Sequence, residues 1–216
     1  MSNALLNEIS EFLQKGRAKN VKELVQQALD SGLSAKDVLN DGLMAGMAIV
    51  GRKFRDNEVF VPEVLVAARA MNVGAALLEP YLADAGVVPA GKAVIGTVAG
   101  DMHDIGKNLV TMMLKGNGFE VIDIGVDVAN EKFVEAAEEA GADVICISAL
   151  LTTTMPRMPE IIELMKAKGV RDKYIVMVGG APVTEAFGKE IGADFYTKDA
   201  ATAAEVAKAA VQKRSA

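Results

Sequence analysis

The sequence predicts an α/β protein in which an N-terminal bundle of four helices precedes a doubly wound, five-stranded parallel sheet. In residues 1–84 the apolar positions recur every three or four residues, which is typical of amphipathic helices. After residue 91, short apolar runs rich in β-branched residues alternate with amphipathic segments, which is typical of β-α units. The Gly- and Pro-containing stretch 85–91 predicts a linker between one domain over residues 1–88 and another over 89–216.

Four helices are expected in the first domain, approximately over residues 5–13, 21–29, 34–54 and 62–78. Gly16 and Gly32 stand where the first two helices should end. Ser34, with Asp37 three residues later, predicts a capping box at the start of the third helix. Pro62 fits the first turn of the fourth helix, where the N–H that proline lacks is not needed.

Five strands are expected in the second domain, and each precedes a segment with helical periodicity. The expected strands are Ala93–Val98, Val121–Ile124, Val144–Ile147, Ile175–Val178 and Ala193–Tyr196. Helices between parallel strands cover both faces of the sheet, and right-handed crossovers restrict the topology. The sequence therefore predicts a flavodoxin-like, doubly wound arrangement.

Charge and composition argue against several classes of protein. The 23 Lys and Arg residues against 29 Asp and Glu residues give a net charge of −6, which disfavours a nucleic-acid-binding surface. We expect no membrane span, because no apolar run approaches the ~18 to 20 residues needed. The N-terminus lacks the pattern of a signal peptide, so we expect a cytoplasmic protein. The single cysteine, Cys146, excludes an internal disulfide and Cys-pair metal or redox motifs.

Residues that follow the expected strands should form the functional site, because ligands of open parallel sheets bind at the carboxyl ends of the strands. Three such segments carry informative residues, namely 100–106, 148–154 and 179–180. The Gly179-Gly180 pair is typical of a tight turn, and on this rim the missing side chains would also leave room for a flat ligand.

His103, the only histidine in the chain, is the candidate metal ligand. A lone histidine is commonly a hydrogen-bonded structural residue, and that interpretation stays open. However, Asp101 two residues earlier is placed to fix the tautomer and orientation of a ligating imidazole, whereas Asp104 is expected to cap the next helix. A single histidine does not make a usual zinc or iron site, but it can be the axial ligand of a metal held by a macrocycle.

Three short blocks at fixed spacing resemble the corrinoid-binding signature of the cobalamin-dependent methyltransferases: Asp101-x-His103-x-x-Gly106, then after 41 residues Ser148-x-Leu150, then after 28 residues Gly179-Gly180. The helical segment resembles the cap that precedes the cobalamin-binding domain of methionine synthase. Both also resemble the corrinoid proteins of methanol, methylamine and aryl methyl ether systems. The resemblance covers nearly the whole chain.

The resemblance implies that one corrinoid, a cobalamin with cobalt, binds with its lower ligand replaced by His103. It makes Asp101 the hydrogen-bond partner of His103 and Thr154 the third member of a proton relay. The cofactor contacts that it implies are Asp101, His103, Asp104, Ile105, Gly106, Ser148, Leu150, Thr152, Gly179, Gly180, Phe54 and Val61. The last two would shield the upper face of the corrin, although the family often has Leu where Val61 stands.

The function that the resemblance implies is a methyl carrier. Cobalt(I) would accept a methyl group from a substrate-specific methyltransferase, and methylcobalamin would yield it to an acceptor-side methyltransferase that acts on tetrahydrofolate or a thiol. A reductive activating protein would be a third partner, and the chain would not be catalytic alone. Two alternatives are a cobalamin-dependent regulator, which would need a DNA-binding domain, and the small subunit of an adenosylcobalamin mutase, which lacks the helical cap.

Overall fold

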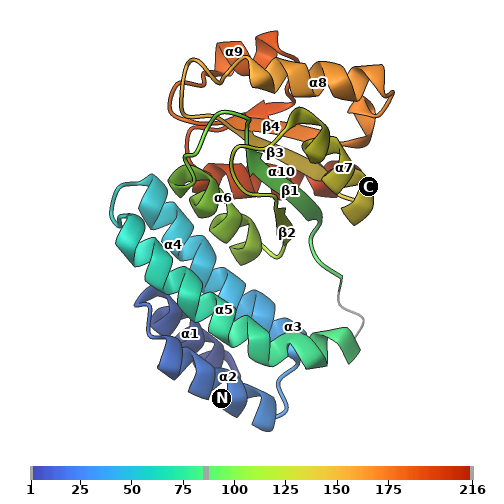
Figure 1. Cartoon of the computed structure of the whole chain (residues 1–216). Coiled ribbons are helices and arrows are strands. Elements are labelled where there is room, and N and C mark those ends of the chain that lie inside the picture. The colour runs from blue at the N-terminus through green and yellow to red at the C-terminus, as the bar shows by residue number, and fades with distance from the viewer. Residues whose placement is uncertain (1, 85–87, 215–216) are drawn as a thin grey trace. The chain divides into compact units, whose positions relative to one another are not determined.

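The computed structural model describes residues 2–84 and 88–214, and the contacts within it divide the chain into two compact units, Met1–Val88 and Pro89–Ala216. The first unit is helical, and the second is a parallel sheet flanked by helices (Figure 1). The α/β class predicted from the change in periodicity is therefore confirmed. The expected linker over 85–91 lies partly outside the described residues.

The helical unit contains four helical segments, of which the third changes its hydrogen-bond pattern along its length. The elements are α1 (Ser2–Gln14), α2 (Ala18–Asp30), α3 (Ala35–Asp37), the π-helical η1 (Val38–Met44), α4 (Ala45–Arg55) and α5 (Val61–Asp84). The segments α3, η1 and α4 follow one another without a break and form the expected third helix. Its π-helical part lies against α1, where a Cβ on Gly42 would be only 3.2 Å from Ile9.

The expected ends of the helices are confirmed. Gly16 and Gly32 have φ values of +65° and +85°, the left-handed conformation that ends a helix without steric cost to glycine. Ser34 Oγ accepts a hydrogen bond of 3.0 Å from the Asp37 N–H and so caps α3. Pro62 is the second residue of α5.

The expectation that no apolar run approaches a membrane-spanning length is wrong for α5. Its segment Val61–Leu82 is long and apolar enough to cross a membrane, with a mean hydropathy of 1.4. However, Val64, Ala67, Ala70 and Leu78 are fully buried, and α5 packs along α2. One side of this helix is therefore buried within the helical unit.

The sheet of the second unit contains the five expected strands, all parallel, in the order β2-β1-β3-β4-β5. They are β1 (Lys92–Thr97), β2 (Glu120–Asp123), β3 (Val144–Ser148), β4 (Ile175–Gly179) and β5 (Phe195–Tyr196). In the centre of the sheet, Val94 of β1 pairs with Ile122 of β2 and with Ile145 of β3. This order is that of the flavodoxin-like fold, with the strand order reversing at β1 and β3.

Helices cover both faces of this sheet (Figure 1). They are α6 (Ile105–Gly116), α7 (Asn130–Ala140), α8 (Arg157–Ala167), α9 (Glu185–Glu190) and α10 (Ala200–Arg214), with a short 3-10 turn η2 (Arg171–Lys173) before β4. The helices α6 and α10 pack against each other on one face. On the other face, Phe133 of α7 and Ile161 of α8 join Ile145 and Val178 of the sheet in one buried core.

A Gly-Ala-Asp sequence occurs twice at the amino ends of strands and makes the same bonds both times. The Asp143 N–H donates to the Lys92 carbonyl, and the Asp143 carboxylate accepts from the Lys92 N–H at 2.8 Å. The Asp194 N–H donates to the Val176 carbonyl, and its carboxylate accepts from the Val176 N–H at 2.7 Å. Each aspartate thus pins the strand that follows it to the neighbouring strand.

Cys146 lies inside β3 and is buried, and burial raises the pKa of its thiol to about 12. Because the thiolate is the reactive form, we expect the native protein to react with Ellman's reagent at pH 8 at least ~100-fold more slowly than the protein unfolded in guanidinium. Equal rates in the two states would show that β3 opens readily.

Candidate functional site

The loops that follow β1 and β3 meet at the carboxyl edge of the sheet, and Asp101 joins them. Its side chain is fully buried. One carboxylate oxygen, Oδ1, accepts from the His103 N–H at 3.1 Å and lies 2.7 Å from His103 Nδ1. The other, Oδ2, accepts from the Leu150 N–H at 2.8 Å, the Leu151 N–H at 3.2 Å and the Thr154 hydroxyl at 2.9 Å.

These bonds set the charge of Asp101. Burial raises the pKa of its carboxyl group, but hydrogen bonds from the Leu150 N–H, from His103 and from Thr154 outweigh burial and hold the pKa well below its ordinary value. The carboxylate is therefore ionised over the whole physiological range of pH and acts as an acceptor in every contact.

An ionised Asp101 fixes the tautomer of His103. Because the carboxylate can only accept, Nδ1 carries a hydrogen, and in the neutral imidazole the lone pair is therefore on Nε2. The His103 side chain is 50% exposed, and within residues 2–84 and 88–214 its Nε2 has no hydrogen-bond partner. This is the form and exposure that an axial metal ligand requires.

The residues that follow His103 lie at the start of α6. Asp104 occupies the N-cap position, but the expected capping bond is absent there: its carboxylate instead accepts from the Asn108 Nδ2 at 3.0 Å. The prediction that Asp104 caps this helix through its side chain is therefore wrong. Ile105 is 70% exposed, and a Cβ on Gly106 would meet no atom within 4 Å.

Exposed apolar side chains lie on the two loops that Asp101 joins. Met102 and Ile105 flank His103 in the chain and are 69% and 70% exposed, and Leu150 and Leu151 on the neighbouring loop are each 39% exposed. Large apolar side chains at a strand-end rim lose water contact when a flat ligand covers them. The two loops thus carry a nitrogen that can coordinate a metal, His103 Nε2, together with exposed apolar side chains.

The two glycines after β4 differ in what they permit. Gly179, paired with Ser148, has free space around its α-carbon, since an added Cβ would meet only Thr197 O at 3.7 Å. Gly180 has a φ of +134°, and an added Cβ would lie 1.8 Å from the Ala149 carbonyl oxygen. The fold itself therefore requires glycine at position 180, and room for a ligand beside the two glycines stays a prediction.

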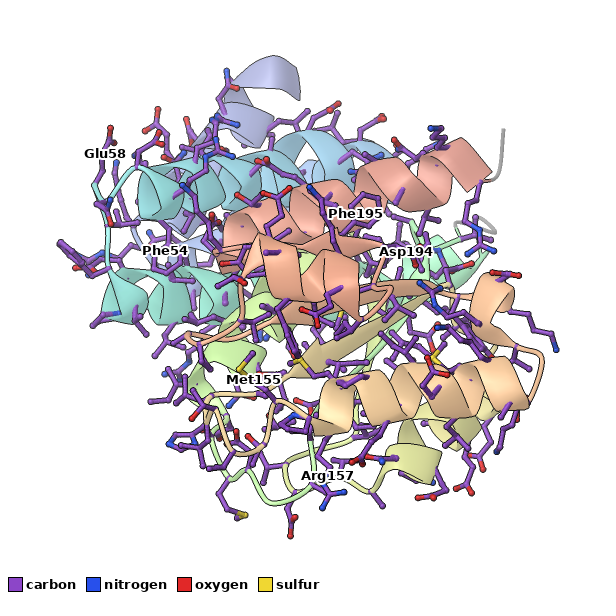
Figure 2. The ribbon with its side chains drawn as sticks, turned by 90° about the horizontal axis from the view of Figure 1, so that it is seen from above. Phe54, Glu58, Met155, Arg157, Asp194 and Phe195 are labelled. Atoms are coloured by element: carbon purple, nitrogen blue, oxygen red, sulfur yellow. The ribbon has the colours of Figure 1, made fainter. Side chains whose placement is uncertain are left out.

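The remaining predicted site residues lie apart from His103 in the chain. Thr152 is exposed on the loop between β3 and α8. Met155 on this loop and Arg157, the first residue of α8, are labelled in Figure 2. Phe54 lies in the last turn of α4 (Figure 2). Val61 begins α5, and both residues are partly exposed and belong to the helical unit. Their role as a shield for a corrin remains a prediction.

Three further residues, not predicted from the sequence, fix the His103 loop or the helix α6 that follows it. The fully buried Thr97 donates a hydrogen bond of 2.9 Å from its hydroxyl to the His103 carbonyl. Asp127, on the loop after β2, bonds to the backbone beside Asp101. Lys107 is 4% exposed and pairs with Asp123 at the end of β2. The sequence signal for Lys107 was its place four residues after His103, on an otherwise apolar side of a helix.

The residues present fit a macrocyclic metal cofactor. Over the described ranges 2–84 and 88–214, no three side chains of the His, Cys, Asp or Glu type converge to hold a metal ion by themselves. His103 offers one oriented nitrogen, the rim offers apolar surface, and the space beside Gly179 is open. A metal whose equatorial positions are already filled needs only the one axial nitrogen.

Comparisons with known proteins agree with this chemistry. A family model described as a B12 binding domain matches residues 91–207, and a second of the same description matches residues 5–79. A corrinoid protein of Desulfitobacterium hafniense is 44% identical over 210 residues, 96% of this chain and 97% of that one. A dimethylamine corrinoid protein of Methanosarcina acetivorans is 44% identical over 204 residues, 94% of this chain and 95% of that one.

A solved structure shares the fold over almost the whole chain. The methanol:cobalamin methyltransferase complex of Methanosarcina barkeri contains a chain that matches with a TM-score of 0.85 and 31% identity, covering 97% of this chain and 80% of that one.

Proposed function

The chain belongs to the corrinoid proteins of methyltransferase systems, and from this premise we propose that it is the methyl carrier of such a system. In this role it binds one cobalamin, receives a methyl group with the help of one methyltransferase, and yields it to a second. The cofactor itself is assigned by the family; the residues that hold it and the route of the methyl group are the proposal.

The observation that carries the proposal is the hydrogen-bonded line from Thr154 through Asp101 to His103. The Asp101 carboxylate of this line is buried while the His103 imidazole is half exposed, so Nε2 of His103 can coordinate a metal. When bound, the corrinoid supplies a cobalt atom that accepts and releases a methyl group. The protein's part is to hold the imidazole oriented and to pass a proton along Thr154, Asp101 and His103 when ligation changes.

The proposed partners are separate proteins that act on the cofactor held by this chain. The α/β unit holds the cofactor site, and the helical unit matches a B12-binding family model over residues 5–79. We propose that the methyl donor and acceptor bind to separate substrate-specific and acceptor-side methyltransferases, and that a reductive activating protein restores oxidised cobalt. We also propose that the carrier works in the cytoplasm, with Phe54 and Val61 covering the upper face of the corrin.

Reconstitution with hydroxocobalamin tests the proposed ligand. In the cobalt(II) state, the electron paramagnetic resonance spectrum is split by the axial nitrogen, so uniform nitrogen-15 labelling of the protein should change that splitting from a triplet to a doublet. His103 is the only histidine, so a doublet would come from it. His103→Ala should abolish the doublet while the fold is kept. A triplet that persists in labelled protein would mean that dimethylbenzimidazole stays on cobalt, and the proposed site would be wrong.

The methyl route is tested with the reconstituted full chain. Methanol, methylamines, betaines and methoxylated aromatics, each with a candidate methyltransferase, should be compared for methylation of the reduced carrier. Transfer to tetrahydrofolate or to a thiol with a second methyltransferase then identifies the acceptor. If the wild-type protein binds cobalamin through His103 but no partner methylates it, the carrier role fails although the binding site stands.

A further inference from the structure

Asp127, on the loop after β2, holds the loop that carries Asp101 and His103. The Gly100 N–H donates a hydrogen bond of 2.7 Å to Asp127 Oδ1. The Asp127 N–H donates one of 3.0 Å to the Asp101 carbonyl. These two bonds run in opposite directions, so they hold the short backbone segment from the Gly100 N–H to the Asp101 carbonyl at both of its ends.

The loop that carries Asp127 is itself firmly anchored. The Thr97 N–H donates to the Gly125 carbonyl at 3.0 Å, and the Val128 N–H donates back to the Thr97 carbonyl at 3.0 Å. Asp123 accepts from the Gly125 N–H at 2.9 Å through one oxygen and pairs with the buried Lys107 through the other. Asp127 therefore stands on a backbone that is tied to both β1 and α6.

The backbone of Asp127 is in an uncommon conformation. Its φ is +51°, and the only other non-glycine residue with positive φ in the described ranges is Asn57. Aspartate and asparagine tolerate this region better than other residues do, but glycine would be the default. Asp127 has this conformation although it is not glycine, and its carboxylate accepts a backbone N–H. This combination indicates that the acceptor is needed there.

We propose that Asp127 is a positioning residue for His103: it keeps the loop after β1 in the conformation in which Asp101 can orient the imidazole. The hydrogen bonds of Asp127 go to backbone groups of Gly100 and Asp101, so it acts on the imidazole through them. A ligand held in advance loses less conformational freedom when it binds metal. The inference rests on the proposed role of His103 as the corrinoid ligand.

Three variants separate the acceptor from the backbone conformation. Asp127→Gly removes the carboxylate but accepts the positive φ, whereas Asp127→Ala removes the carboxylate and adds strain. Asp127→Asn keeps both the Oδ1 acceptor and the tolerance for this φ. In the cofactor-free protein, amide hydrogen exchange at Gly100 should be about tenfold faster in the glycine and alanine variants and close to wild type in the asparagine variant.

The second readout is histidine ligation in the cobalt(II) protein. Because supporting partners of a metal ligand commonly contribute 10- to 100-fold to affinity, we expect Asp127→Gly to lower the affinity for the histidine-ligated corrinoid by about tenfold. Asp127→Asn should restore it. Asp143→Gly is the matched control: it removes a carboxylate that accepts a backbone N–H at 2.8 Å from Lys92 at the amino end of β1, whereas Asp127 accepts one from the loop after the carboxyl end of β1. It should affect stability without changing ligation.

Histidine ligation in the Asp127 and Asp143 variants decides whether Asp127 positions His103. Wild-type ligation in Asp127→Gly would overturn the inference, as would an asparagine variant that fails as badly as the glycine variant. An equal loss in Asp143→Gly would show that general stability, not loop position, was measured. If wild-type protein itself does not bind cobalamin through His103, the proposed function fails first, and the Gly100 exchange rates would then report only on the loop.

Discussion

Replacing Asp101 with asparagine is expected to lower the unfolding free energy of the α/β unit by about 2 to 4 kcal/mol at neutral pH. The amide has one acceptor oxygen, whereas both oxygens of Asp101 accept hydrogen bonds from donors of His103, Leu150, Leu151 and Thr154. In either orientation, the amide NH2 faces donors that it cannot satisfy. The corrinoid should still bind, but with weaker ligation by His103 and a shifted cobalt(II)/cobalt(I) midpoint, since the carboxylate makes the imidazole a stronger ligand.

The stability difference between wild type and Asp101→Asn should also depend on pH. The pKa of Asp101 is lowered in the folded state, so its ionised form favours folding at all pH values above the unfolded pKa near 3.9. The difference should be constant from about pH 5 to pH 7 and should shrink as the pH falls below about 4, because the unfolded state then binds a proton more readily.

Hydrogen exchange of the strand amides, followed by mass spectrometry over this pH range, measures the α/β unit separately from the helical unit. Asp143→Asn is the control, because it makes the same chemical change at the other end of β1 and keeps an acceptor oxygen for the Lys92 N–H. It should leave both ligation and the midpoint unchanged. A stability of Asp101→Asn equal to wild type at pH 7 would contradict the assignment of an ionised, fully bonded carboxylate.

The adjacent glycines after β4 should respond in opposite ways to alanine. In Gly180→Ala the new methyl group collides with the Ala149 carbonyl at a positive φ, and we expect a loss of about 3 to 5 kcal/mol or failure to fold. In Gly179→Ala the methyl group meets only Thr197 O at an ordinary distance, so the cofactor-free protein should lose less than about 1 kcal/mol.

Corrinoid binding separates the two glycines further. If the nucleotide tail lies beside Gly179, the added methyl group should lower cobalamin affinity by about tenfold or more in a protein of normal stability. Thermal unfolding of the cofactor-free variants and cobalamin titration measure the two effects. A stable Gly180→Ala protein would show that the loop can move away from Ala149, and unchanged affinity in Gly179→Ala would place the tail elsewhere.

Much of this fold follows from periodicity in the sequence. The apolar runs located four of the five strands to within one residue at each end, because burial on both faces makes a parallel strand nearly continuously apolar. The exception, β5, begins at Phe195 and not at Ala193, because the Asp194 side chain takes the Val176 N–H that a backbone carbonyl would otherwise accept. The π-helical turn in the third helix was not predictable, since it depends on how closely Gly42 approaches Ile9 of another helix.

The candidate site was predictable where residues act through local spacing. Asp101 and His103 are two residues apart, so their contact could be expected from the motif. Asp127 carries no motif, and its bond to Gly100 spans 27 residues that only the pairing of β1 with β2 brings together. The capping role expected of Asp104 was wrong because residue type alone does not decide between a backbone N–H and the side chain of Asn108.

The paired bonds of Asp143 and Asp194 lie at the amino ends of the strands, away from the His103 edge of the sheet. These bonds use only groups of the chain itself, so the alignment of β1 with β3 and of β4 with β5 does not require a bound ligand. We therefore expect the polypeptide to be synthesised and folded first and charged with cobalamin afterwards, and to exchange a damaged cofactor without unfolding. A cell short of cobalamin would then accumulate cofactor-free carrier. The supply of cobalamin would set the fraction of the carrier that is loaded.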